Sequence, residues 1–185
     1  EAVKAMVPVL AGKVGMDGLV MLVDLLGRAL ALRARAGGRE AGEDLSFVWR
    51  PAIEDHEQNG SEEVLDHLVR AARDVAESVA RSSPDAFRAV IGHMETKREK
   101  IFTRIALHLL RVCPDAAPDI FSRYMVNRAM LDDLDVYHEY GLLMTARFGG
   151  LNPAQQQTII GWVEQGPDME EYAKEARGGE GDHPT

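Results

Sequence analysis

PDAFRAVIGH, at residues 84–93, is the first of three related segments in this 185-residue chain. PDIFSRYMVN follows at 118–127 and PAQQQTIIGW at 153–162. With one earlier proline, the spacings are 33, 34 and 35 residues, between Pro51, Pro84, Pro118 and Pro153. Seven places after each of the last three prolines stands a large apolar residue: Ile91, Met125 and Ile160. Such a period is typical of stacked helical hairpins, each with one long and one short helix.

The residues around these prolines carry helix-start signals. Ser83 and Asn152 are good N-cap residues, and proline suits the first helical position because its missing N–H would be unpaired there in any case. Between the prolines, apolar residues recur at three- and four-residue spacing. We expect long helices over 17–35, 62–81, 96–112 and 128–148. We expect short helices over 3–11, 51–58, 84–94, 115–127 and 153–165, and one or two exposed turns over 168–177.

No stretch alternates apolar and polar residues over the length of a strand. The sequence therefore predicts an all-α fold in which antiparallel helical hairpins stack as a short α-solenoid, because short links force neighbouring helices to reverse. The inner side of the helix at 128–148 is expected to carry Met130, Leu131, Leu134, Tyr137, Leu142 and Met144. One domain is expected over 1–177, with a mobile loop at 36–46 (AGGREAGEDLS) and a disordered tail at 178–185.

Charge and composition exclude several classes of partner. The formal net charge is −9 and the pI about 5.1, which argues against nucleic acid or an anionic membrane as the main partner. The apolar run at 16–32 holds Asp17, Asp24 and Arg28, which a bilayer span rarely carries. Cys113 is the single cysteine, so no internal disulfide forms and a cytoplasmic location is the simplest fit. Because the chain starts at Glu1 without an initiator Met, we expect a piece of a larger protein.

The densest polar cluster is WRPAIEDHEQN, at residues 49–59. One interpretation is a metal or acid–base site that joins the acids and histidine of this cluster to Asp135 and His138. The favoured interpretation is a solvated surface turn anchored by Trp49 and Ile53, because consecutive helical residues point about 100° apart and do not converge on one ion. Neither His-Glu pair is followed by the second histidine of a zincin motif, and no phosphate-binding loop is present. No cofactor is expected.

Large side chains suggest two further kinds of binding site. Trp49 and Trp162 are candidate anchors for a partner, although both also suit a core position. Met130, Met144 and Phe102 lie on predicted core faces and are the candidate lining of an enclosed apolar pocket.

The hairpin period resembles an α-solenoid of the HEAT or armadillo kind. FVWRPAIEDHEQN, at 47–59, and LNPAQQQTIIGWVEQGPD, at 151–168, resemble segments in the helical arms of very large bacterial multidomain proteins. Some of those proteins carry a nucleotide-binding switch module and act in phage defence. The resemblance implies a sensor or scaffold arm whose catalysis, if any, lies elsewhere in the parent protein.

The leading hypothesis is a non-catalytic helical-repeat region that binds a protein or another domain of its parent chain. Its candidate binding residues are Trp49, Arg50, Glu54, Asp55, His56, Glu57 and Trp162. Two alternatives stay open, namely a small all-α metal-dependent enzyme that uses the cluster from Glu54 to Glu57, and a helical regulatory domain that holds a small apolar ligand.

Overall fold

The structure, a computed structural model, describes residues 14–40, 44–59 and 64–166. All regular secondary structure in these ranges is helical, as predicted. The expected short helix at 3–11, the turns at 168–177 and the tail at 178–185 lie outside the described residues. The helices are α2 (Gly15–Ala36), α3 (Ser46–Trp49), α4 (Val64–Ala80), α5 (Pro84–Glu95), α6 (Lys100–Val112), α7 (Pro118–Met125), α8 (Arg128–Asp132), α9 (Tyr137–Arg147), the 3₁₀ turn η1 (Phe148–Gly150) and α10 (Pro153–Gln165).

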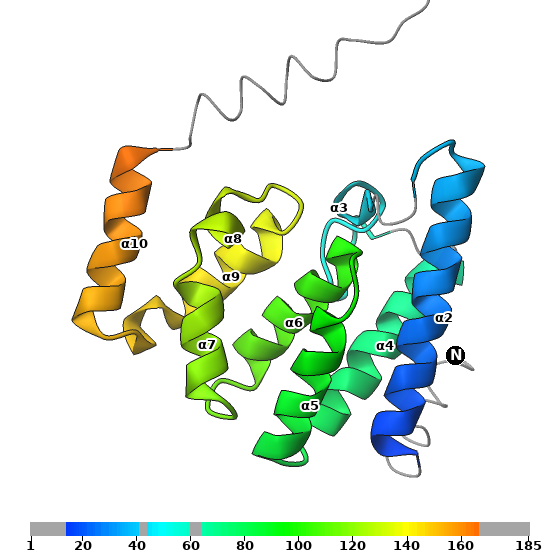
Figure 1. The fold of residues 1–185 in the computed structure, drawn as a ribbon, viewed down its shortest axis with the longest axis horizontal. Helices are drawn as coiled ribbons and strands as arrows, with labels where there is room; N and C mark the ends of the chain where they lie inside the picture. Colours follow the sequence, from blue (N-terminus) through cyan, green and yellow to red (C-terminus); the bar gives the residue numbers. More distant parts are fainter. Residues whose placement is uncertain (1–13, 41–43, 60–63, 167–185) are drawn as a thin grey trace, which may run out of the picture.

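The longer helices pack against one another in chain order. α2 packs along α4, α4 packs against α5 and α6, and α6 packs against α9. Figure 1 shows α2, α5, α7 and α10 in chain order across the molecule, with α2 at one edge and α10 at the other. The Tyr140 hydroxyl donates to the carbonyl of Met125 at 2.7 Å and so joins α9 to the end of α7.

Of the four regularly spaced prolines, Pro84, Pro118 and Pro153 each begin a helix, as the sequence predicts. At α5, Ser83 Oγ accepts a hydrogen bond from the backbone N–H of Ala86 at 3.1 Å, and Pro84 occupies the first turn. At α10, Asn152 and Gln155 form a reciprocal capping box. α7 begins at Pro118 with no side-chain cap.

The predicted inner face of α2 is buried. Leu19, Val23 and Leu26 are fully covered, and Leu22 and Leu30 nearly so. They join one continuous core with Phe87 of α5 and Phe102 of α6. None of the helices in the described part of the chain has the length and apolar character needed to span a membrane.

The prediction of a helix starting at Pro51 is wrong. Residues 51–59 form an irregular loop instead. The reason is that side chains bond to backbone carbonyls that a helix would use: Arg104 Nη2 donates to the carbonyl of Pro51 at 3.0 Å, and Arg73 Nη1 donates to that of Ile53 at 2.9 Å. Side-chain donors of this kind compete with the backbone N–H groups of a helical turn.

The prediction of one long helix at 128–148 is also wrong, because this segment forms two helices, α8 and α9. Asp133, at the end of α8, adopts an extended ψ of 105°, and its Oδ1 accepts from Asp135 N–H at 3.0 Å. Its carboxylate also pairs with Lys100. The break turns two expected core residues outward, so that Leu134 is 66% and Tyr137 65% exposed.

Several helix ends differ from the predicted ones. Thr96 closes α5, with its hydroxyl donating to the carbonyl of His93 at 2.7 Å, so α6 starts at Lys100 rather than at Thr96. α7 is shorter than the predicted 115–127. Ile91 and Met125 are fully buried, whereas the third member of that set, Ile160, is 39% exposed.

Candidate functional site

The loop at residues 50–59, which contains most of the predicted site, lies against charged side chains from three helices. Arg50, at its start, has no exposed surface and forms an ion pair with Asp66 of α4. Arg50 Nη2 also donates to the carbonyl of Ile53 at 2.9 Å and closes the turn. An arginine suits this position because its planar group supplies several donors in fixed directions.

Arg104 of α6 and Glu139 of α9 hold the loop from its other side. Arg104 Nε lies 2.7 Å from Glu139 Oε2, and both side chains are at most 2% exposed. Arg104 Nη2 donates to the carbonyls of Arg50 and Pro51 at 2.8 and 3.0 Å. Glu139 accepts the backbone N–H of Ile53, so one buried pair fixes two stretches of loop backbone.

Arg73 of α4 completes this arrangement. Its Nη1 donates to the carbonyl of Ile53 at 2.9 Å and to Asp55 Oδ1 at 3.1 Å. At the end of the loop, Asn59 Nδ2 donates to the carbonyl of Glu54 at 2.6 Å. We refer to the charged side chains that hold the loop, Arg50, Asp66, Arg73, Arg104 and Glu139, as the buried network.

Each charge of the buried network has a partner of opposite charge, and the partners of Arg73 are Asp55 and Asp74, outside the network. Burial lowers the pKa of Arg50 to about 10, and the nearby Asp66 opposes that change. Arg50 therefore stays protonated at neutral pH. Breaking one such pair is costly, because the remaining charge is left without a counter-charge in the interior.

The outer part of the loop contains the predicted Glu54–Glu57 cluster. Glu54 pairs with Arg111 of α6 at 2.7 Å, and Asp55 pairs with Arg73. Burial opposes ionisation of Asp55, but the hydrogen bond and charge of Arg73 outweigh it and lower the pKa of Asp55. His56 and Glu57 are exposed, and His56 Nδ1 accepts from the N–H of Gln58 at 3.2 Å.

The two predicted tryptophan anchors lie in different surroundings. Trp49 is partly buried, with the guanidinium of Arg33 5.0 Å from its ring centre. Trp162 is partly buried on α10, and its carbonyl accepts from Arg128 Nη1 at 3.0 Å. Arg128 Nη2 also reaches the carbonyl of Gly166 at 2.6 Å, so this arginine of α8 caps the C-terminal end of α10.

The acid–base alternative needs the loop and α9 to converge on one ion. In the described part of the chain, no group of three His, Cys, Asp or Glu side chains is arranged to hold a metal. The contact between the loop and α9 runs through Glu139, while His138 is exposed. Burial raises the pKa of Asp135, and the neighbouring Asp133 adds to that effect.

A distant side chain caps α6 near these acids. Asp44 is buried, and its Oδ2 accepts from the backbone N–H of Ile101 at 2.6 Å. Its Oδ1 accepts from Ser46 N–H at 2.6 Å, at the start of α3. The preceding N-cap residue of α6, Glu99, makes no side-chain cap. The end of the predicted mobile loop at 36–46 is thus bonded to two helix starts.

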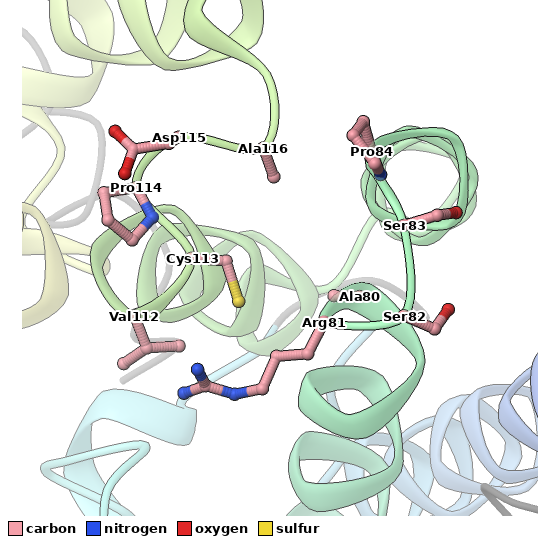
Figure 2. A pocket seen from close by; sticks show the side chains of 10 residues that line it. All are labelled: Ala80, Arg81, Ser82, Ser83, Pro84, Val112, Cys113, Pro114, Asp115 and Ala116. Atoms are coloured by element: carbon pink, nitrogen blue, oxygen red, sulfur yellow. The ribbon is translucent and has the colours of Figure 1, made fainter.

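The residues predicted to line an apolar pocket lie in the core or against it. Phe102 is fully buried in the core, and Met130 and Met144 are partly buried and pack against the core. An open groove of about 450 Å³ lies instead between the α4–α5 and α6–α7 turns. Figure 2 shows Cys113 between the two turns and Arg81 reaching past it, with Ser82, Ser83 and Pro84 along one side. Burial raises the pKa of the Cys113 thiol, which is unfavourable for a nucleophile.

A second buried titratable group lies between α4 and α6. His108 of α6 is 7% exposed, and its Nε2 lies 3.3 Å from Glu77 Oε2 of α4. Burial lowers the pKa of His108, although Glu77 opposes this change. Arg111 and Arg73 add to the lowering, because each carries a like charge.

Asp66, Arg73, Arg104 and Glu139 were missed from the sequence. The available signal was the register: Asp66 and Arg73 stand seven residues apart on the stripe that buries Leu65 and Val69. A charged residue at core spacing needs a buried partner of opposite charge. The four residues are two acids and two arginines, so such partners exist within the set.

Comparison with known proteins gives no relative. No protein-family model, no curated protein and no solved structure matches this chain. The helical fold and the loop geometry are therefore the basis of the functional interpretation.

Proposed function

We propose that this chain is a non-catalytic helical-repeat region, with its hairpins stacked as a short α-solenoid, that binds a protein or another domain of its parent chain. The proline period and the row of neighbouring helices support this arrangement. Stacks of this kind present extended surfaces, which suit macromolecular partners better than small substrates. The resemblance to helical arms of large bacterial proteins also supports this proposal. We place the protein in the cytoplasm as part of the same proposal.

The observation that carries the proposal is the way the loop at 50–59 is held. Its backbone is bonded to arginines of α4 and α6 and to Glu139 of α9, yet its tip is exposed at Asp55, His56, Glu57 and Gln58. A loop held by a rigid frame with polar side chains at its tip is a common form of recognition surface. Preorganisation of this kind lowers the entropy lost on binding.

The charged groups of the site support binding over catalysis. Glu54 and Asp55 are each paired with arginine, and the buried network faces loop backbone rather than a cavity. A catalytic acid or base needs access to a substrate proton. In this loop, the groups with free access are His56 and Glu57, both at the tip.

Native mass spectrometry and cross-linking of the purified chain in a lysate of its own host test the proposal. We expect a stoichiometric protein complex, with cross-links that include the loop tip. A His56→Ala/Glu57→Ala variant should lose the partner and keep the wild-type unfolding midpoint, because both side chains are exposed. A stoichiometric metal or small molecule retained by the chain, with no protein partner, would contradict the proposal.

A further inference from the structure

α2 carries a second apolar stripe, on the side away from the core. Val14, just before the helix, and Met21, Leu25 and Leu32 on it are 44%, 57%, 49% and 65% exposed. The opposite side of the same helix packs on α4 and is buried. Figure 1 shows α2 at the edge of the helical row, with α4 and α5 on its inner side.

The spacing of this stripe is that of a helix–helix seam. Positions 14, 21, 25, 28, 32 and 35 follow intervals of seven, four, three, four and three residues. At about 100° per residue, these positions fall within an arc of about 80°. Alternation of three and four residues is the pattern by which one helix packs lengthwise against another. We call these six positions the α2 seam.

The C-terminal half of the α2 seam is basic. Arg28 and Arg35 are exposed, and neither forms an ion pair with any carboxylate of the described residues. Asp24, one turn before Arg28, forms an ion pair at 2.6 Å with Lys97, which lies between α5 and α6. Parallel pairing of two copies of α2 along this seam would place arginine against arginine, which like-charge repulsion disfavours. A partner helix with acids along its length would instead complement both arginines.

We propose that the α2 seam is the docking surface for an amphipathic helix of a partner protein. The apolar stripe of that helix covers Met21, Leu25 and Leu32, and its acidic residues pair with Arg28 and Arg35. This inference rests on the proposed function, which it deepens by naming a surface and a class of partner. Helix docking of this kind buries apolar area for affinity, while the flanking charges select the partner.

Two synthetic peptides test the inference on the full chain. Both have 21 residues, with leucine at the two seam positions of each heptad; the flanking positions are glutamate in one peptide and lysine in the other. Binding is measured by fluorescence anisotropy at low and high salt. We expect the glutamate peptide to bind at least about tenfold more tightly, a difference that salt reduces.

Variants locate the binding on the seam. Arg28→Glu/Arg35→Glu should reverse the preference between the two peptides, whereas Leu25→Glu should weaken both by about tenfold or more. Arg98→Glu is the control for Arg28→Glu, because Arg98 is also exposed and lies outside α2. All four side chains are on the surface, so the unfolding midpoint should stay within about 2 °C of the wild-type value.

Four results overturn the inference: no binding of either peptide, equal affinity for both, self-association that Leu25→Glu abolishes, or tighter peptide binding once residues 1–13 are deleted. Self-association would mean that a second copy of the chain occupies the seam. Tighter binding after the deletion would mean that residues 1–13 occupy it. The proposed function is judged separately. If the natural partner is lost with His56→Ala/Glu57→Ala but kept with Arg28→Glu/Arg35→Glu, protein binding stands and the seam is not its surface.

Discussion

Arg104 and Glu139 face one another in the interior through two hydrogen bonds, at 2.7 and 2.9 Å, although 35 residues separate them in the chain. Each also bonds to the backbone of the loop at 50–59. The pair therefore fixes the backbone of the loop as well as joining α6 to α9. Because both groups are removed from water, neither tolerates the loss of the other.

Glu139→Gln should lower the free energy of unfolding by about 3–5 kcal/mol, because it leaves Arg104 buried without a counter-charge. Urea denaturation followed by circular dichroism measures the change. His138→Gln is the matched control, since His138 is the exposed neighbour of Glu139, and should change stability by no more than about 0.5 kcal/mol. Equal effects of the two substitutions would contradict a role for the ion pair.

Asp44→Ala should destabilise the chain by about 1–2 kcal/mol, because it removes the acceptor that caps α6 at Ile101. The loss should also speed hydrogen exchange at the first turn of α6. Glu40→Ala is the control, as Glu40 is an exposed acid of the same connection. An unchanged midpoint for Asp44→Ala would show that water replaces the cap.

His108→Gln should flatten the pH dependence of stability between about pH 7 and pH 5. The folded pKa of His108 lies below its ordinary value, so the unfolded chain binds the proton more tightly and stability falls as pH falls through the unfolded pKa. The groups that face His108 are Glu77, Arg73 and Arg111. Urea midpoints measured across this range give the slope, with His67→Gln, an exposed histidine, as the control. A slope equal to that of the wild type would contradict a buried neutral His108.

Arg128→Ala should loosen α10 without unfolding the remaining helices. Arg128 supplies two hydrogen bonds to the C-terminal carbonyls of that helix, at 3.0 and 2.6 Å. A charged donor of this kind is worth about 1.5–3 kcal/mol, so exchange across α10 should rise roughly tenfold or more. Hydrogen exchange with mass spectrometry resolves this helix from α5, which should keep its protection. Arg123→Ala, which removes a more exposed pair with Glu95, is the control.

Local chemistry made much of the helical content predictable. Ser83-Pro84 and Asn152-Pro153 mark helix starts by capping and by the fixed φ of proline, and α5 and α10 begin there. Pro51 has the same spacing but no helix, because Arg104 and Arg73 bond to the carbonyls of Pro51 and Ile53. These arginines are 53 and 20 residues away, so no local pattern contains them. The all-α class follows from local signals, whereas the loop and the buried network depend on long-range contacts.

The break at Asp133 follows the same principle. Apolar spacing across 128–148 suits one helix, yet Asp133 bonds to its own chain two residues ahead and to Lys100. A short acidic side chain offers the backbone this alternative, and the distant lysine decides the outcome. The sequence predicts a solvated cluster of acids at 54–57, whereas Glu54 and Asp55 pair with arginines of α6 and α4 that lie far away in the chain.

The bond from Ile53 to Glu139 has a consequence for how the chain can be divided. In an ideal repeat array each unit contacts only the next, so terminal units can be removed one by one. Here a loop before α4 takes its acceptor from α9, across 86 residues. A fragment that ends at α7 would leave Arg104 buried without its acid and Ile53 without its acceptor. We therefore expect the segment from Arg50 to α9 to unfold as one unit, whereas a change of length beyond α9 would leave this bond intact.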